Sequence, residues 1–257
     1  MIRPSQDTPP YTVAIIADIH GNLTALEAVL ADLATRHYDQ LVIAGDLVMN
    51  GPFPAETLAR MRDLRVPTIY GETDRAVVEA DNANPLAQWT AEQIGPTGIE
   101  YLKTLPFSHS ITPSQSTATD TELLIVHATP TNAGAFLILQ PNPLDARCSA
   151  LTPEAEALAM LGEVTAPIIV HGHLHYASSG VVGACRVVSI GSVGFPFDGN
   201  PQAAYALATW EDTHWNIAHR RVPYDVERAI VAVECSGQPL AETIIQRLRA
   251  ARWSTPK

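Results

Sequence analysis

Short apolar runs recur along the chain, each about the length of one buried β-strand. The first five cover residues 13–17, 41–44, 67–70, 123–126 and 167–170. Leucines at helical spacing in 22–36, and a segment that starts with proline at 54–64, predict two helices between the first three runs. Strands that alternate with helices in this way predict a parallel arrangement with helical crossovers.

The second half of the chain is richer in predicted strands. Strands are predicted at 107–111, 181–185, 187–190, 203–209 and 215–219, and helices at 75–105, 153–161, 226–233 and 240–251. Polar residues and proline in 112–121 predict an exposed loop, and 130–150 lacks periodicity, which predicts a loop near the site. We therefore expect an α/β fold in which two sheets pack together with helices outside. We expect a single domain over 1–257, in which 1–11 form a flexible N-terminal segment.

Polar residues of a few kinds directly follow several of these runs. The motifs, in chain order, are Asp18-Ile19-His20-Gly21-Asn22, Gly45-Asp46, Gly71-Glu72-Thr73-Asp74, His127 and Gly172-His173-Leu174-His175. Strand ends are where an α/β sheet presents its functional loops. Aspartate, glutamate and histidine are the side chains that hold divalent metals for hydrolytic chemistry. The motif order therefore predicts a metal-dependent hydrolase.

Two of the motifs carry pairs of ligand-type residues separated by one position. Asp18 and His20 form one pair, and His173 and His175 form the other. Residues i and i+2 of an extended segment point to the same side, so each pair can address one point in space. A single pair of this kind is more often a turn or a surface feature than a ligand set. The prediction of a metal site therefore depends on the whole set of motifs.

The composition predicts the cellular compartment of the protein and disfavours two classes of partner. The chain has 27 acidic against 16 basic residues, a net charge of −11, so nucleic acid and anionic membranes are not expected partners. Its three cysteines are far apart, which predicts reduced thiols in a cytoplasmic protein. No apolar segment approaches the length of a membrane span, and the N-terminus lacks the apolar stretch of a signal peptide.

The motif order DxHGN, GD, GNxD, H and GHxH is typical of calcineurin-like metallophosphoesterases, and residues 12–208 resemble a small bacterial member of that family. Gly191-Ser192-Val193-Gly194, with Pro196 and Asp198-Gly199 after it, is similar to a late segment of the family's small phosphodiesterase branch. The resemblance implies two mixed β-sheets packed as a sandwich flanked by α-helices. It also implies two divalent transition-metal ions, for which Mn, Fe, Zn and Ni are candidates.

Carried over residue by residue, the resemblance implies seven metal ligands: Asp18, His20 and His175 for the first ion, Asp46 as a bridge, and Glu72, His127 and His173 for the second. A hydroxide held by the metals would attack phosphorus in line, with Asp46 and His127 among the catalytic residues. The metals would also neutralise the phosphoryl oxygens. No side-chain nucleophile is implied.

Three further residues are predicted to act beside the metals. Asp74 is expected to anchor its loop or to orient a ligand, and it is counted with the catalytic residues. Arg75 is a candidate for a bidentate contact with substrate phosphate, although a solvated arginine at a helix start fits equally well. Asn22 is a candidate helix N-cap, and the resemblance places it close to the metals as a candidate substrate contact.

Two positions depart from the family pattern. Thr73 stands where many family phosphatases have a histidine that protonates the leaving group. Glu72 stands where the family usually has asparagine, and three interpretations stay open: a carboxylate ligand, a side chain that turns away or fills the second site, and a surface residue after a shifted loop. As a ligand, Glu72 would leave two divalent ions with one net positive charge rather than two, which weakens their attraction for a phosphoanion.

The sequence thus predicts metal-dependent hydrolysis of a phosphoester or pyrophosphate bond in a small molecule. Phosphodiesters and dinucleoside polyphosphates come first among the substrates, because relatives of this branch resemble enzymes for both. The alternative is a degenerate member of the fold that binds metal or a partner without turnover, which Glu72 alone favours. A nuclease is disfavoured because the chain lacks a basic stripe. A homo-oligomer stays open.

Overall fold

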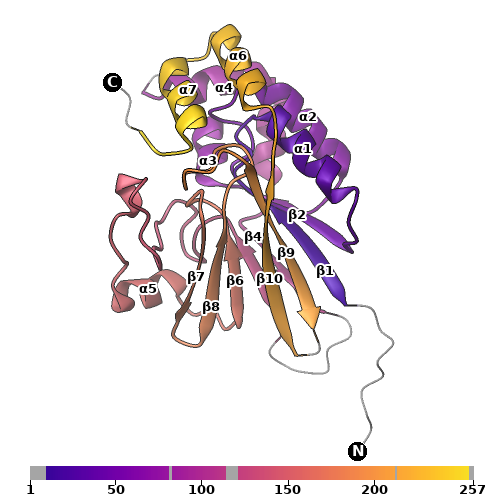
Figure 1. The fold of residues 1–257 in the computed structure, drawn as a ribbon, viewed down its shortest axis with the longest axis vertical. Coiled ribbons are helices and arrows are strands. Elements are labelled where there is room, and N and C mark those ends of the chain that lie inside the picture. Colours follow the sequence, from indigo (N-terminus) through magenta and orange to yellow (C-terminus); the bar gives the residue numbers. More distant parts are fainter. Residues whose placement is uncertain (1–9, 81–82, 114–120, 212, 255–257) are drawn as a thin grey trace, which may run out of the picture.

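Two five-stranded sheets pack face to face in the computed structural model, which describes residues 10–80, 83–113, 121–211 and 213–254 (Figure 1). The first sheet consists of β1 (Tyr11–Ile16), β2 (Gln40–Ala44), β3 (Thr68–Ile69), β9 (Ala203–Glu211) and β10 (His214–Val222). The second consists of β4 (Ser108–Ile111), β5 (Leu123–Val126), β6 (Ile168–His171), β7 (Ala177–Val182) and β8 (Cys185–Ile190). This is the predicted α/β sandwich.

Both sheets mix parallel and antiparallel pairs. The strand order is β10-β9-β1-β2-β3 in the first sheet and β4-β5-β6-β8-β7 in the second. β1 and β2 are parallel, as are β2 and β3, which confirms the prediction from alternating strands and helices. In the second sheet β6 is parallel to β5 and β8, and β4 and β7 are antiparallel edge strands. Parallel strands end at one edge of a sheet, where their loops gather functional side chains.

The central strands are buried on both faces, which explains why their sequences are continuous apolar runs rather than alternating ones. In β1, Val13 and Ile15 belong to the core between the two sheets. Ala14 and Ile16 point the other way, into the core beneath the helices that cover the first sheet. All four side chains are fully buried, so β1 is fixed in register by packing on both sides.

Helices cover the outer faces of the sandwich. They are α1 (Leu23–Leu33), α2 (Pro54–Leu64), α3 (Glu72–Val78), α4 (Pro85–Thr104), α5 (Glu154–Leu161), α6 (Val226–Ser236) and α7 (Ala241–Ala250). The side-chain oxygen of Asn22 accepts a hydrogen bond from Ala25 N at 3.1 Å, which confirms Asn22 as the N-cap of α1. Helices α6 and α7 lie together at the top of Figure 1, and their apolar faces pack against Phe195 and Phe197.

Two predicted elements join parts of the chain that the structure separates. The strand predicted at 181–185 is interrupted by the tight turn between β7 and β8, in which Gly183 takes a left-handed φ of 59°. The helix predicted over 75–105 begins earlier, at Glu72, and is divided into α3 and α4. Within α4, Gly95 has a non-helical backbone with φ 65°, so the helix is kinked there.

Some expectations fall on parts of the chain that are not described. The flexible segment predicted over 1–11 falls mostly on 1–9, outside the described residues, whereas Tyr11 already belongs to β1. Most of the loop predicted at 112–121 likewise lies outside them, in 114–120. Within the described ranges, none of the helices combines the length and apolar character that a membrane span requires. The single domain stays a prediction.

Candidate metal centre

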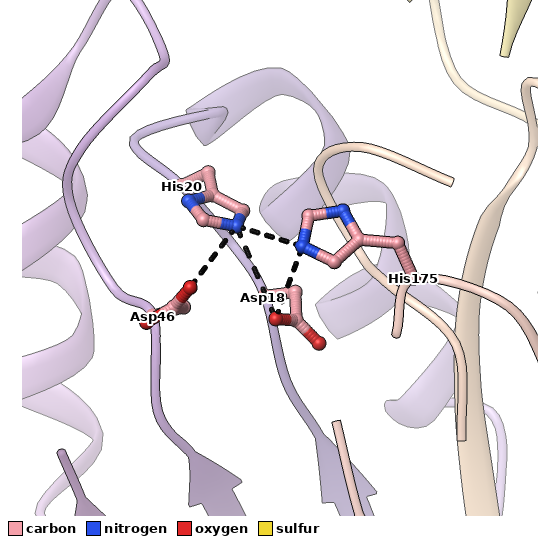
Figure 2. A group of neighbouring side chains, drawn as sticks. All are labelled: Asp18, His20, Asp46 and His175. Atoms are coloured by element: carbon pink, nitrogen blue, oxygen red, sulfur yellow. Dashed lines mark hydrogen bonds and ion pairs between the residues drawn. The ribbon is translucent and has the colours of Figure 1, made fainter. Parts of the chain in front are cut away.

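The loops that follow β1, β2, β3, β5 and β6 bring the seven predicted metal ligands together. They form two groups, Asp18, His20, Asp46 and His175 in the first and Glu72, His127 and His173 in the second. Within each group the candidate ligand atoms all lie within 4.8 Å of one another. Figure 2 shows the first group, whose four side chains point toward a common centre above the ends of two strands.

The first group is closely packed and buried. His20 Nε2 lies 3.1 Å from His175 Nε2 and 3.4 Å from Asp46 Oδ2. His175 Nε2 lies 3.3 Å from Asp18 Oδ1. All four residues are buried. The group therefore offers two imidazole nitrogens and two carboxylates around one point, a donor set that suits a divalent transition metal.

The second group lies beside the first, and Asp46 of the first group also contacts it. Asp46 Oδ1 is 3.4 Å from His127 Nε2, whereas its Oδ2 faces His20 in the first group. Glu72 contributes both carboxylate oxygens: Oε2 lies 2.6 Å from His127 Nε2, and Oε1 lies 3.1 Å from His173 Nδ1. The interpretation of Glu72 as a surface residue on a shifted loop therefore does not fit this geometry, and the other two interpretations stay open.

Hydrogen bonds on the far side of two imidazole rings determine what these rings present to the centre. His127 Nδ1 lies 2.8 Å from Ala44 O, and His175 Nδ1 lies 2.6 Å from Phe195 O. A carbonyl oxygen can only accept, so each Nδ1 carries a proton and each Nε2 is the ring atom that faces the carboxylates. Each of these positions therefore suits a cation between Nε2 and the carboxylates, either a proton on Nε2 or a metal ion in its place.

Several buried polar atoms at the centre have no hydrogen-bond partner among the described residues. They are Asp46 Oδ2, Glu72 Oε2, His127 Nε2, and both ring nitrogens of His173. Buried polar atoms in native proteins are nearly always paired, and an unpaired set calls for an ion or a ligand. All five atoms belong to metal-ligand residue types, so the residues present fit a metal centre.

The ionisation of the second group follows from its mixed charges. Burial lowers the pKa of His127, but the carboxylates of Asp46 and Glu72 outweigh burial and hold this pKa well above its ordinary value. Burial raises the pKa of Glu72, but His127 and His173 hold it well below its ordinary value. Glu72 is therefore a carboxylate, and the negative charges around His127 favour a cation at this position.

Five of the seven candidate ligands have a left-handed backbone. They are Asp18 (φ 53°), His20 (φ 52°), Asp46 (φ 55°), His173 (φ 62°) and His175 (φ 62°). This conformation is uncommon outside glycine, and residues held in it cluster at functional sites. The backbone of these loops is therefore locally strained, and in this conformation the five side chains point toward one centre.

Two glycines beside the ligands are required for space rather than for φ. A Cβ on Gly71 would collide with the Asp46 carboxylate, and a Cβ on Gly172 would collide with the Asp18 carboxylate. Gly21 (φ 65°) and Gly45 (φ 87°) have a left-handed backbone, which glycine adopts without strain. The motifs that begin at Gly71 and Gly172 therefore leave the space that the carboxylates of Asp46 and Asp18 occupy.

Asp74 connects the loops of the two groups. Its Oδ2 accepts hydrogen bonds from the backbone N–H groups of Asp46 and Gly71, and its Oδ1 accepts one from Leu47, each at 2.9 Å. Burial and the nearby Asp46 charge raise the pKa of Asp74 to about 7, although the backbone donors oppose the rise. Asp74 thus anchors the loops, and its catalytic role stays a prediction.

The two candidate substrate contacts make other interactions in this structure. Arg75 is exposed, and its guanidinium carbon lies 4.9 Å from the centroid of the Tyr70 ring. Asn22 is buried, and its amide nitrogen donates to Gly194 O at 3.0 Å while its oxygen caps α1. Contacts of either residue with substrate stay a prediction.

A cavity of about 150 Å³ opens onto the metal centre. His20, Glu72, Thr73, His173 and His175 line it. Arg147, Arg247 and Trp253 line it as well, together with Phe195 and Phe197. No motif spacing marks these three residues in the sequence, because they come from a loop, from α7 and from the segment after it.

Comparisons with known proteins agree with this architecture. The family model described as the calcineurin-like phosphoesterase superfamily domain matches residues 12–213. An uncharacterized protein of Methanocaldococcus jannaschii is 24% identical over 237 residues, which cover 84% of this chain and 89% of that protein.

Two solved structures share the fold over 95% of this chain and 100% of their own. A metallophosphoesterase from Sphaerobacter thermophilus is 24% identical with a TM-score of 0.71. A hypothetical protein from Pyrococcus horikoshii OT3 is 22% identical with a TM-score of 0.77. Both similarities extend beyond residue 213 and so include part of the segment that carries α6 and α7.

Proposed function

Because the chain belongs to the calcineurin-like phosphoesterase superfamily, we propose that it uses two divalent metal ions to hydrolyse a phosphoester or pyrophosphate bond in a small molecule. The observation that carries this proposal is the pair of adjacent ligand groups that the Asp46 carboxylate contacts and that contain unpartnered buried atoms. When bound, the metals would activate water and neutralise charge on the phosphoryl oxygens.

The chain's own residues would hold and orient this centre. Asp18, His20 and His175 would hold one ion, and one oxygen of Asp46 faces each group, as a bridge requires. Glu72, His127 and His173 would hold the other ion. Ala44 O fixes the His127 ring through Nδ1, so its Nε2 is presented as a ligand without rotation.

Thr73 stands at the position where the family resemblance places the acid that protonates the leaving group. Thr73 lines the cavity, and its buried hydroxyl has no hydrogen-bond partner in the described parts of the chain. A threonine hydroxyl is too weak an acid to protonate an alkoxide as it departs. Substrates with stable leaving groups, such as aryl diesters and pyrophosphate-linked nucleotides, therefore suit this site better than alkyl monoesters.

The degenerate-scaffold alternative depends on Glu72. Its carboxylate lies between His127 and His173, where it is placed either to bind the second ion or to fill its position. His127 and His173 hold the pKa of Glu72 well below its ordinary value, and the resulting carboxylate suits either role, since it can bind a metal or pair directly with these two rings.

The test combines metal analysis with an activity screen. We expect the purified protein, supplied with Mn²⁺, to retain two ions per chain and to hydrolyse bis(4-nitrophenyl) phosphate and diadenosine tetraphosphate. General acid catalysis typically contributes about 10²–10⁴-fold, so glycerol phosphate should react at least about 10²-fold more slowly. A metal-saturated protein that hydrolyses none of these compounds would overturn the proposal. Equal rates on glycerol phosphate and the aryl diester would refute the leaving-group argument.

A further inference from the structure

The cavity at the metal centre is also lined by two arginines that come from two distant parts of the chain. Arg147 lies in the short 3-10 helix Ala146–Cys148, and Arg247 lies in α7. Both guanidinium carbons lie over the ring of Trp253, at 3.5 Å and 3.7 Å from its centroid. We refer to these three residues as the arginine wall.

The two arginines differ in how their charge is balanced. Arg147 donates from Nε and Nη2 to the two carboxylate oxygens of Asp145, which is fully buried. Arg247 is only 9% exposed, and its Nε and Nη2 both donate to the carbonyl oxygen of Ser254. No carboxylate pairs with Arg247 within the described ranges, so the wall has one positive charge more than its partners cancel.

A charge without a counter-ion among the described residues is costly unless an anion accompanies it. A buried cation without a counter-ion is strongly disfavoured, and stacking on an aromatic ring offsets only part of that cost. Burial and the nearby Arg147 lower the pKa of Arg247, but only to about 10, so it stays charged at neutral pH. In both arginines the described hydrogen bonds use Nε and Nη2, which leaves the Nη1 donors for a ligand.

Aromatic rings connect the arginine wall with the metal ligands across the same cavity. The Phe197 ring stacks on His175 at 4.5 Å with an interplanar angle of 9°, and its centroid lies 5.7 Å from that of Trp253. His175 and Arg247 both line the cavity of about 150 Å³. A ligand that fills this cavity would therefore lie next to both the metal ligands and the arginine wall.

We propose that Arg147 and Arg247 bind the second phosphate group of a pyrophosphate-linked substrate whose scissile phosphate lies at the metal centre. This inference rests on the proposed function and selects among its substrates, because a simple phosphodiester has no second anionic group for the wall. Arginine is suited to this role, since its planar fork matches phosphate oxygens. The ligand class is thus a nucleoside polyphosphate or a related pyrophosphate diester.

The same contact accounts for the missing acid at Thr73. In hydrolysis of a P–O–P link, the oxygen of water bonds to the scissile phosphorus and the bond to the bridging oxygen breaks. The electron pair stays on the departing phosphate, and the water proton passes to solvent. The charge that develops on the departing group lies next to Arg147 and Arg247, which stabilise it without a proton donor.

Binding of non-hydrolysed probes tests the subsite independently of turnover. Calorimetry on the Mn²⁺-loaded full-length protein would compare inorganic phosphate, which has one phosphorus, with imidodiphosphate, which has two. We expect imidodiphosphate to bind at least about tenfold more tightly, a difference of about 1.4 kcal/mol. R247Q should abolish this difference. R249Q is the matched control, because Arg249 lies on the same helix, is exposed and pairs with Glu227, so it should leave the difference unchanged.

Kinetics provides the second readout. R247Q should lower the ratio of kcat/KM for diadenosine tetraphosphate to kcat/KM for bis(4-nitrophenyl) phosphate by about 10- to 100-fold, since each charge-assisted contact contributes about 1.5–3 kcal/mol. R247K should lower this ratio less than R247Q does, because lysine keeps the positive charge but lacks the planar guanidinium group. If R247Q matches R249Q in both measurements, the arginines are structural and the inference is overturned.

The outcomes separate this inference from the proposed function. If the wild-type protein hydrolyses no phosphoester, but R247Q weakens its binding of imidodiphosphate, the anion subsite is supported and the proposed function is refuted. If the wild-type protein hydrolyses the aryl diester and R247Q leaves the ratio of the two kcat/KM values unchanged, the proposed function is supported and the subsite is refuted. If R247Q fails to fold, R147Q decides, because Arg147 lies on a separate loop and should produce the same change in ratio.

Discussion

The two groups of candidate ligands are built in different ways. In the first group, four short side chains leave loops at the ends of β1, β2 and β6, and all four residues have a left-handed backbone. In the second group, Glu72 reaches the site from the first turn of α3, and its side chain is 35% exposed. The first group is thus fixed by the scaffold, whereas the second depends on a longer and more accessible side chain.

This difference shows where the centre can change without loss of the fold. The backbone that aims the first group is strained and locked by neighbouring loops, so a substitution there disturbs several residues at once. Position 72 lies at a helix start, where a change of side chain leaves the backbone in place. The charge of the centre can therefore be altered at Glu72, while its geometry is held by the first group.

The strongest test of the comparison is Asp46→Asn, because the Asp46 carboxylate contacts both groups. Its carboxylate faces His20 through Oδ2 and His127 through Oδ1, and an amide nitrogen at either position cannot bind a cation. We expect at least about a 10³-fold loss of kcat, equivalent to about 4 kcal/mol, and a lower metal content by mass spectrometry. Asp63→Asn, an exposed change on α2, is the control. Wild-type turnover of Asp46→Asn at saturating Mn²⁺ would refute the bridge.

The pH dependence of stability tests the surroundings of the second group. Burial, and then the adjacent His173, lower the pKa of His171 from an ordinary 6.5 to about 4. Between these values the unfolded chain binds more protons than the folded protein. The neutral His171 therefore contributes fully above pH 6.5, and its contribution decreases as the pH falls toward 4, by about 3 kcal/mol in total.

This contribution can be isolated with His171→Gln, which removes the titrating ring. Urea unfolding at pH 7 and pH 4.5 should show a smaller loss of stability on acidification for the variant than for the wild type. Other groups titrate in this range as well, so the difference between the two proteins is the quantity to compare. Equal losses would show that His171 titrates normally in the folded protein.

Asp74→Asn tests the connection between the two groups. Asp74 accepts three backbone hydrogen bonds, and an asparagine keeps one acceptor oxygen while turning an NH₂ group toward a backbone N–H. Leaving a buried donor unsatisfied costs about 1–3 kcal/mol, so we expect a loss of that size in the free energy of unfolding. A variant as stable as the wild type would mean that the loops are held by other contacts.

Glu72→Asn should weaken metal binding less than Asp46→Asn does, and its result separates the two open interpretations of Glu72. We expect the second ion to be held about tenfold more weakly, by about 1.4 kcal/mol, because one charged ligand becomes neutral. With metal in excess, the centre should bind inorganic phosphate more tightly and turn over aryl diesters faster. Glu79→Asn, at an exposed position just after α3, serves as the control.

The alternative interpretation of Glu72 leads to a different result in the same experiment. If the carboxylate fills the second position, the native protein is inactive and Glu72→Asn creates activity. Metal content, phosphate inhibition and turnover, measured for both forms, separate these outcomes. Loss of activity at saturating metal would contradict both interpretations and assign Glu72 a direct role in the reaction.

The parallel strands and the convergence of the motifs could be predicted because each motif directly follows a buried strand. The apolar run at 41–44 predicts a buried strand by itself, and the place where this run ends predicts the position of Asp46. The turn at Gly183 could not be predicted, because the apolar residues on both sides resemble one continuous strand.

The arginine wall was missed for a different reason. Arg147 and Arg247 are a hundred positions apart, and neither lies at a spacing that marks a site. Only tertiary packing shows that the two side chains meet at Trp253. The role of Glu72 was ambiguous in sequence because a carboxylate suits a ligand, a plug and a surface equally well, and only the distances to His127 and His173 reduce the choice.

The position of Arg247 and Trp253 beyond residue 213 has an evolutionary consequence. Every candidate ligand lies within the family match at 12–213, whereas Arg247 and Trp253, which line the same cavity, are encoded after it. A substitution in this later segment can change what the cavity accepts and leaves every candidate ligand in place. Substrate preference and metal binding can therefore change independently of each other.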